Sequence, residues 1–207
     1  MKIGIDIDGV ILDFERTMRT YAELYDALIL NKDGVKNKDE FSYLNRYDWT
    51  EEEKNTFINN YLVYVTINST PLIPLAKTML EIFDKENIEY CFITARGLIK
   101  KETKDAVINV FNRNNIDTSN IYFGVSNKVD MCKKLGIDYM IEDNPNTCKA
   151  LIDNNIKTLY FRDKESEIIS DSENIHEVSN VGEIVRFLLN IKGFSNDKEG
   201  YEKILRK

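Results

Sequence analysis

The first thirteen residues, MKIGIDIDGVILD, restrict the fold more than any other part of the chain. Their alternating isoleucines predict a short buried strand, and Asp6, Asp8 and Gly9 lie where that strand ends. In an open parallel sheet, ligands bind outside the carboxyl ends of the strands. Two carboxylates one residue apart repel each other, and the repulsion raises one of their pKa values. The pair therefore suggests chemistry that uses one ionised and one protonated carboxyl group beside a divalent cation, such as phosphoryl transfer through an aspartate.

Strand and helix patterns alternate along most of the remaining sequence. Further strands are expected at 89–93, 121–123, 138–141 and 158–161, helices at 75–85, 98–114, 128–135, 145–154 and 181–189, and a long loop at 162–180. Strands that alternate with helices of about 10–15 residues indicate βαβ crossovers. The sequence thus predicts an α/β fold with a doubly wound, mostly parallel sheet of the Rossmann-like type.

One segment, residues 15–73, breaks this alternation. It is rich in aromatic residues and carries two helical patterns, one over 14–30 and one after the N-cap signal at Thr50. We therefore interpret it as an inserted helical cap. The expected domains are a core of residues 1–14 and 74–192, the cap of residues 15–73 and a weakly patterned C-terminal tail of residues 193–207.

The composition disfavours several kinds of partner and location. The formal charge is −7 and the sequence pI about 5.0, and an acidic surface disfavours nucleic acid polymers and anionic membranes. The start lacks an apolar signal segment, and no apolar run reaches the ~18 residues of a membrane span. A cytoplasmic protein is therefore expected. Cys91, Cys132 and Cys148 form no CxxC pair and are expected to be reduced and buried.

A single histidine, His176, limits the chemistry further. It lies in an acidic stretch without any other sign of a binding site. A Ser-His-Asp triad, a Cys-His pair and a multi-histidine zinc site are therefore disfavoured. Any hydrolysis would depend on carboxylates, lysine, threonine and a hard metal ion.

Four polar segments follow predicted strands or open the helix after one. They are Asp6-Ile7-Asp8-Gly9, Thr94-Ala95-Arg96-Gly97, Lys128 and Glu142-Asp143-Asn144-Pro145. Because the strand ends of a parallel sheet meet at one crevice, these segments are expected to lie together despite their separation in sequence.

In order and spacing, these segments resemble the four motifs of the haloacid dehalogenase-like (HAD) hydrolase superfamily. DIDGV, FITAR, SNK and IEDNP occupy the motif positions, and the resemblance covers residues 1 to about 161. The helical insertion is similar to the superfamily's first cap position. DIDGVILDFE and IEDNPNT look most like the cytosolic 5′(3′)-deoxyribonucleotidase type of 5′-nucleotidase.

The resemblance implies two different tasks for the acid pair. Asp6 would attack phosphorus in line and form an aspartyl-phosphate. Asp8 would protonate the departing ester oxygen and then deprotonate the water that hydrolyses the intermediate. Gly9 would let the backbone turn sharply beside the substrate. Within the superfamily, an aspartate two residues after the nucleophile marks phosphatases and phosphomutases.

The remaining motifs would bind the phosphate. Thr94 would donate its hydroxyl to a phosphoryl oxygen, with help from the amide of Ala95. Lys128 would pair with both the phosphate and Asp6, and would offset charge in the transition state.

The resemblance also implies Mg²⁺, a cation that prefers hard oxygen ligands. Asp6 and Asp143 would be side-chain ligands, the carbonyl of Asp8 a third protein oxygen, and Glu142 would act through water. Such an ion would neutralise charge between the nucleophile and the phosphoryl oxygens.

Two kinds of side chain keep more than one interpretation. Arg96 would either touch the phosphate or sugar or form a structural salt bridge, and Asn144 would orient a metal-bound water or fix the turn before the proline. In the cap, Phe57, Tyr61 and Tyr64 have the helical spacing of cap core. Tyr47 and Trp49 lie in a loop and are the candidates for stacking on a base or sugar.

We therefore expect a Mg²⁺-dependent phosphomonoesterase that acts on a small phosphorylated metabolite, with (deoxy)nucleoside 5′-monophosphates as the first substrate hypothesis. A phosphatase of another metabolite, such as a sugar phosphate, is the alternative among enzymes, followed by a phosphomutase. A non-catalytic binding or regulatory module on the same scaffold is the alternative from another class. The sequence leaves open whether the protein forms a homodimer.

Overall fold

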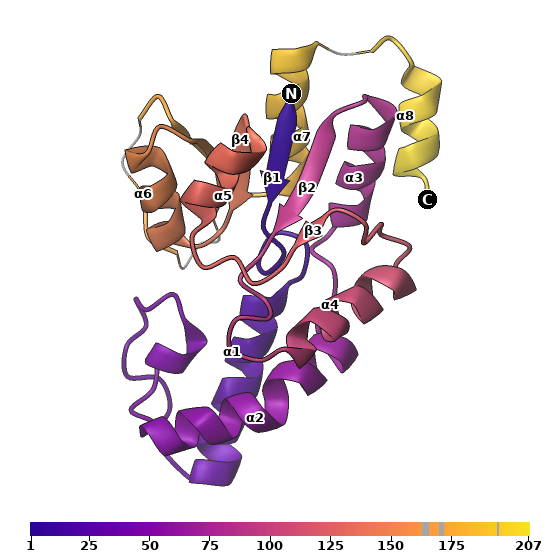
Figure 1. Ribbon diagram of the computed structural model, residues 1–207. Helices are drawn as coiled ribbons and strands as arrows, with labels where there is room; N and C mark the ends of the chain where they lie inside the picture. The colour runs from indigo at the N-terminus through magenta and orange to yellow at the C-terminus, as the bar shows by residue number, and fades with distance from the viewer. Residues whose placement is uncertain (163–165, 170–171, 194) are drawn as a thin grey trace.

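A computed structural model describes residues 1–162, 166–169, 172–193 and 195–207 (Figure 1). Its centre is a six-stranded parallel sheet with the strand order β3-β2-β1-β4-β5-β6. The strands are β1 (Lys2–Ile5), β2 (Glu89–Ile93), β3 (Ile121–Tyr122), β4 (Tyr139–Glu142), β5 (Lys157–Phe161) and β6 (Ile175–Val178). The sequence order reverses between β1 and β4, so the crevice at the carboxyl ends of the strands lies beside β1.

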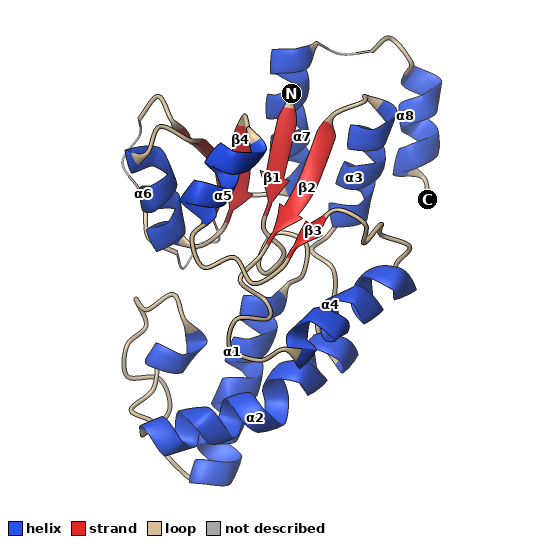
Figure 2. Ribbon diagram, in the orientation of Figure 1, coloured by secondary structure: helices blue, strands red, loops and turns tan. Residues whose placement is uncertain are grey.

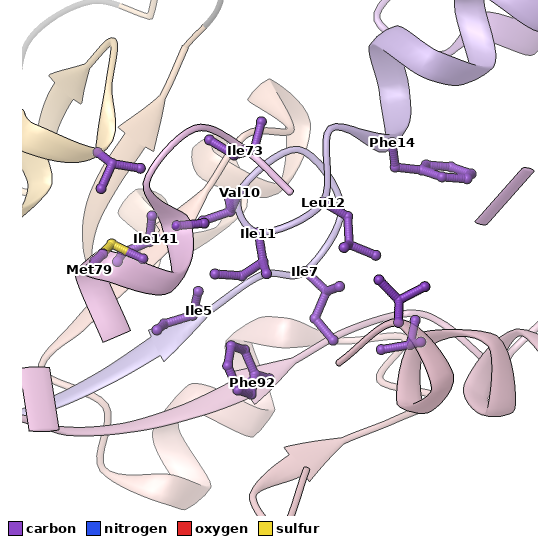
Figure 3. Close-up of a cluster of buried hydrophobic side chains, with 14 of the residues drawn as sticks. Ile5, Ile7, Val10, Ile11, Leu12, Phe14, Ile73, Met79, Phe92 and Ile141 are labelled. Carbon is purple, nitrogen blue, oxygen red and sulfur yellow. The ribbon is translucent and has the colours of Figure 1, made fainter. Parts of the chain in front are cut away.

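Side chains alternate between the two faces of the sheet and form two separate buried clusters. On β2, Phe92 belongs to the larger cluster, whereas Cys91 and Ile93 belong to the smaller one. On β4, Ile141 and Met140 divide in the same way, as the two-residue period of a strand requires. In Figure 3, Ile5, Phe92 and Ile141 lie near one another in the larger cluster, with Met79, Val10, Ile11 and Ile73 close by.

Helices cover both faces (Figure 2). Buried side chains of α3 (Ala76–Lys85), α4 (Glu102–Arg113) and α7 (Val181–Lys192) complete the larger cluster. Those of α5 (Lys128–Leu135) and α6 (Pro145–Asp153) complete the smaller one. The C-terminal helix α8 (Lys198–Leu205) packs on α3.

A helical segment lies beyond the carboxyl ends of β1 and β2, whose arrowheads point toward α1 in Figure 1. It contains α1 (Phe14–Tyr25), a π-helix (Asp26–Leu30), a 3₁₀ turn (Tyr43–Asn45) and α2 (Glu51–Asn68). The chain enters and leaves this segment at adjacent points, because Leu12 pairs with Leu72 and the amide of Asp13 donates to the carbonyl of Pro71 at 3.0 Å. Helix α2 also packs against α4 of the sheet region.

The capping signal in α2 has the expected chemistry. The Thr50 hydroxyl accepts a hydrogen bond from the amide of Glu53, and the Glu53 carboxylate accepts one from the amide of Thr50. This reciprocal capping box satisfies two amides that the helix itself cannot pair.

The predicted α/β fold with a doubly wound parallel sheet is confirmed, two local predictions are wrong, and one helix lies where no element was predicted. The helix expected from Leu98 begins only at Glu102. The expected loop 162–180 contains strand β6, although residues 163–165 and 170–171 lie outside the described part of the chain. The weakly patterned tail contains α8. Among the described residues, no helix combines the length and apolarity that a membrane span requires.

Candidate active site

The four polar segments line one pocket at the carboxyl ends of the strands, with a volume of about 530 Å³. Its described lining includes the sequence candidates Asp6, Asp8, Thr94, Ala95, Lys128, Glu142, Asp143 and Asn144. They come from the ends of β1, β2 and β4 and from the first residue of α5. The structure therefore brings together residues that are up to 138 positions apart in the chain.

Gly9 and Asp143 approach each other too closely for any side chain at position 9. A Cβ atom built on Gly9 would lie 1.7 Å from Oδ2 of Asp143. The φ angle of Gly9 is +77°, in the left-handed region that favours glycine. Gly9 thus allows the backbone after β1 to pass directly beside the Asp143 carboxylate.

Lys128 bridges two of the acids. Its Nζ lies 2.6 Å from Oδ1 of Asp6 and 2.6 Å from Oε2 of Glu142. The side chains of Asp6 and Glu142 are buried, and that of Lys128 is 10% exposed. Burial acts to lower the pKa of Lys128, but the charges of Asp6 and Glu142 outweigh it and raise the pKa above its ordinary value. The ammonium group is therefore charged. Asn127 caps the helix that carries it, since its side chain accepts from the amide of Asp130 at 3.2 Å.

The acids around this lysine could hold a cation. Asp6, Glu142 and Asp143 each offer a carboxylate oxygen, and the three oxygens lie within 4.8 Å of one another. Burial raises the pKa of Asp6 to about 7, and Glu142 and Asp8 add to the rise while Lys128 opposes it. Burial and the charge of Glu142 also raise the pKa of Asp143 well above its ordinary value. The donor set of buried hard oxygens with excess negative charge fits Mg²⁺.

Thr94 and Ala95 follow β2 directly. The amide of Thr94 donates to the carbonyl of Tyr122 at 3.0 Å, which extends the pairing of β2 with β3. Its hydroxyl accepts from the amide of Arg96 at 3.1 Å and can donate its own hydrogen. Both residues line the same pocket as the acids.

Arg96 does not reach the pocket lining. Its Nε and Nη2 donate to Oδ2 and Oδ1 of Asp8 at 2.7 and 2.8 Å, and its side chain is 5% exposed. Of the two interpretations of Arg96, the structure shows the salt bridge. The partner in this salt bridge is Asp8 itself.

Tyr47 and Trp49 do not line this pocket either. Both are buried, and their rings stack on each other with centroids 4.6 Å apart. The indole Nε1 of Trp49 donates to Asp26 at 2.7 Å, and the Tyr47 hydroxyl donates to Glu23 at 2.8 Å. They belong to the aromatic core of the helical segment, as Phe57 does. The structure thus places the candidate stacking residues among the buried side chains of the helical segment.

Two further residues line the pocket: Asn144, which has the local role before Pro145 that was one of its two interpretations, and Glu15, which the sequence did not single out. Asn144 caps α6, because its side chain accepts from the amides of Asn146 and Thr147 at 2.9 and 3.2 Å. Glu15 of α1 lines the pocket and also an adjoining cavity of about 220 Å³. Burial raises the pKa of Glu15 to about 7, although a hydrogen bond from the amide of Tyr43 opposes the rise. A glutamate within the first turn of a helix is ordinary in sequence, so no signal distinguished it.

Solved structures share this architecture, whereas sequence comparison matches neither a known protein family nor a curated protein. A HAD family hydrolase from Deinococcus radiodurans, solved with bound phosphate and sodium, has a TM-score of 0.66 at 11% identity over 92% of this chain and 96% of its own. A protein described as a predicted phosphoglycolate phosphatase from Haemophilus somnus has a TM-score of 0.60 at 14% identity, over 90% and 96%. CbbY from Rhodobacter sphaeroides, in complex with phosphate, has a TM-score of 0.60 at 14% identity, over 88% and 95%.

These likenesses define the fold. The chain shares its α/β fold with these solved structures over 88–92% of its length. The four segments that resemble the superfamily's motifs lie at one edge of that fold and line one pocket.

Proposed function

We propose that this protein is a Mg²⁺-dependent phosphomonoesterase that works through an aspartyl-phosphate intermediate. One observation carries the proposal: Lys128 Nζ contacts Asp6 inside a cluster of buried acids, at the edge of the sheet where ligands bind. A buried carboxylate beside a fixed cation and hard-metal ligands is suited to attack on a phosphoryl group.

The chemistry needs two in-line displacements. An oxygen of Asp6 forms a bond to phosphorus while the ester oxygen leaves. Asp8, whose two oxygens accept from Arg96, must first take up a proton from solvent, and it then gives that proton to the leaving oxygen. A water molecule then attacks phosphorus, Asp8 takes its proton, and the bond from phosphorus to Asp6 breaks to release inorganic phosphate. Lys128 and the Thr94 hydroxyl stabilise the charge on the transferring group.

Asp6, Asp143 and the carbonyl of Asp8 would hold the metal ion, with Glu142 near enough to act through water. When bound, Mg²⁺ supplies positive charge that lets the phosphate and the acids share one site. The buried acid cluster supports this assignment, because burial and the repulsion of neighbouring carboxylates both raise the pKa values of Asp6 and Asp143, and a bound divalent cation would favour their ionised forms.

The substrate is a small phosphorylated metabolite. Tyr47 and Trp49 are packed in the helical segment and do not line the pocket, so they do not support stacking on a nucleobase. Phe41 is the aromatic side chain among the described residues that line the pocket. We therefore place sugar phosphates and similar hydroxylated metabolites before nucleoside 5′-monophosphates.

A phosphate-release screen tests the proposal. Purified protein would be incubated with Mg²⁺ or with EDTA, and with a panel of sugar phosphates, nucleoside 5′-monophosphates and p-nitrophenyl phosphate. We expect metal-dependent release that Asp6→Asn reduces by at least about 10³-fold. Asp138→Asn, which removes an exposed carboxylate far from the pocket, is the matched control. Release that is absent for the whole panel, or retained by Asp6→Asn, would contradict the proposal.

A further inference from the structure

The guanidinium group of Arg96 connects three segments that are distant in the sequence. Two of its nitrogens donate to both oxygens of Asp8, and Nη1 donates to Oγ1 of Thr66 on α2 at 2.9 Å. Its Cζ lies 4.0 Å from the centroid of the Phe14 ring, at the start of α1. The Phe14 ring thus contacts the face of the guanidinium group, while Asp8 and Thr66 accept hydrogen bonds from its nitrogens.

The bidentate pair of Arg96 and Asp8 fixes the orientation of the Asp8 carboxylate as well as its distance from the guanidinium group. Two parallel bonds from an arginine to a carboxylate hold the plane of the carboxylate. The side chain of Asp8 is 28% exposed and lines the pocket, whereas Arg96 is buried behind it. The backbone of Arg96 is itself anchored, since its carbonyl accepts from the amide of Gly124 at 2.8 Å. Arg96 can thus act on the reacting groups through Asp8.

Thr66 makes this arrangement depend on α2. It is fully buried near the C-terminal end of the helix, and its hydroxyl donates to the carbonyl of Leu62 at 2.7 Å. That donation leaves the oxygen free to accept from Arg96. Through Arg96, the Thr66 side chain thus links the position of α2 to the orientation of the Asp8 carboxylate.

We propose that Arg96 is the positioning residue of Asp8 and that Thr66 sets the position of Arg96. The placement of α2 then controls the direction in which Asp8 faces the leaving group. This inference rests on the proposed function, because it requires Asp8 to serve the ester oxygen. It differs from a role in which Arg96 binds the substrate phosphate, since that role would not depend on Asp8.

Two substrates distinguish these roles. p-Nitrophenyl phosphate releases a stable anion that needs no proton, whereas glycerol 2-phosphate releases an alkoxide that does. Single-turnover release of the leaving group would be measured for Arg96→Ala and Thr66→Val. We expect Arg96→Ala to slow glycerol 2-phosphate by about 10²-fold, as small misplacements of reacting groups do, and p-nitrophenyl phosphate by much less. Thr66→Val should give about a tenfold loss with the same substrate preference.

A matched control is available on the same helix. Arg113 of α4 donates to the Ile67 carbonyl of α2, next to Thr66, and does not contact Asp8. Arg113→Ala removes a cation from the same end of α2 and should keep the wild-type rates. Arg96→Lys keeps the charge but loses the bidentate geometry. It replaces Arg96→Ala as the test variant if Arg96→Ala lowers the folded fraction.

A double-mutant cycle completes the test. In an Asp8→Asn background, Arg96→Ala should add almost no further loss on either substrate, because both changes remove the same effect. Three results would overturn the inference while the proposed function stands. They are equal losses of Arg96→Ala on the two substrates, a raised KM of Arg96→Ala, and a full additional loss from Arg96→Ala in the Asp8→Asn background. If the wild-type protein does not cleave glycerol 2-phosphate, the best alkyl phosphate of the panel takes its place in the comparison. A wild-type protein that cleaves no substrate of the panel would overturn both the inference and the proposed function.

Discussion

Lys128 Nζ lies 2.6 Å from Oδ1 of Asp6 in a buried environment. Removing one partner of such a pair leaves an uncompensated buried charge, which costs about 3–5 kcal/mol. We expect Lys128→Ala to lower the free energy of unfolding by this amount at pH 8 and by less at pH 5, where Asp6 can take up a proton. Urea unfolding at both pH values measures the effect. Lys133→Ala, which removes an exposed lysine of the same helix, should change little; equal effects of the two substitutions would contradict the assignment.

The contact between Gly9 and Asp143 gives a second prediction. Gly9→Ala would force a Cβ atom into the Asp143 carboxylate and would also strain a backbone with φ +77°. Gly136→Ala has the same strain at φ +64° and nothing within 4 Å of the added Cβ. We expect Gly136→Ala to cost only about 1 kcal/mol, whereas Gly9→Ala should also weaken Mg²⁺ binding at least tenfold. Mg²⁺ titration by calorimetry separates the two, and equal Mg²⁺ affinity in both variants would exclude the close contact as a requirement of the site.

The sequence predicted the central elements of the fold because their signals are local. β1, β2 and β4 are apolar runs, and α5 and α6 begin at Lys128 and Pro145 after a capping asparagine. β6 was missed since it is a short edge strand with two exposed polar residues, His176 and Glu177. Helix α8 has no buried residue, and long-range contacts anchor its segment, such as the hydrogen bond from the Tyr201 hydroxyl to Glu86 at 2.7 Å. Such contacts leave no periodic pattern in the sequence.

The candidate site likewise has features that the sequence predicted and features that it could not predict. The motif order predicted which strand ends would meet, and Asp6, Thr94, Lys128 and Asp143 line one pocket. Their catalytic roles remain predictions. The motif order also placed Arg96 near Asp8, but the sequence could not decide between a salt bridge and a contact to substrate, and it did not identify Asp8 as the partner in the salt bridge. Tyr47 and Trp49 show the reverse problem, since an aromatic residue in a loop has the same sequence pattern whether it packs inward or faces a ligand.

A third prediction concerns the stability of the metal site as pH changes. Burial raises the pKa of Asp6 from 3.8 to about 7. Without a metal ion, Asp6 therefore holds its proton in the folded protein but loses it in the unfolded chain between about pH 4 and 7, and this group makes stability fall as pH rises through that window. Mg²⁺ competes with these protons. The rise in Tm on adding Mg²⁺ should thus be larger at pH 8 than at pH 5.5. Asp143→Asn should reduce the rise at pH 8, and a rise independent of pH would argue against metal binding by these acids.

Glu15 supplies the last prediction. Its carboxyl accepts a hydrogen bond from the amide of Tyr43 at 2.8 Å, and burial raises its pKa from 4.5 to about 7. The unfolded chain ionises Glu15 above about pH 4.5 and the folded protein only above about pH 7, so this group makes stability fall as pH rises between these values, and the full loss is present at pH 8. Glu15→Gln keeps an oxygen for the Tyr43 amide but cannot ionise. The substitution should be more stabilising at pH 8 than at pH 5 by roughly 1–3 kcal/mol, one pKa unit being about 1.4 kcal/mol. Urea unfolding at the two pH values measures this difference, with Glu89→Gln as a control at an exposed carboxylate. A Glu15→Gln effect that does not change with pH would show that Glu15 ionises as easily in the folded protein as in the unfolded chain.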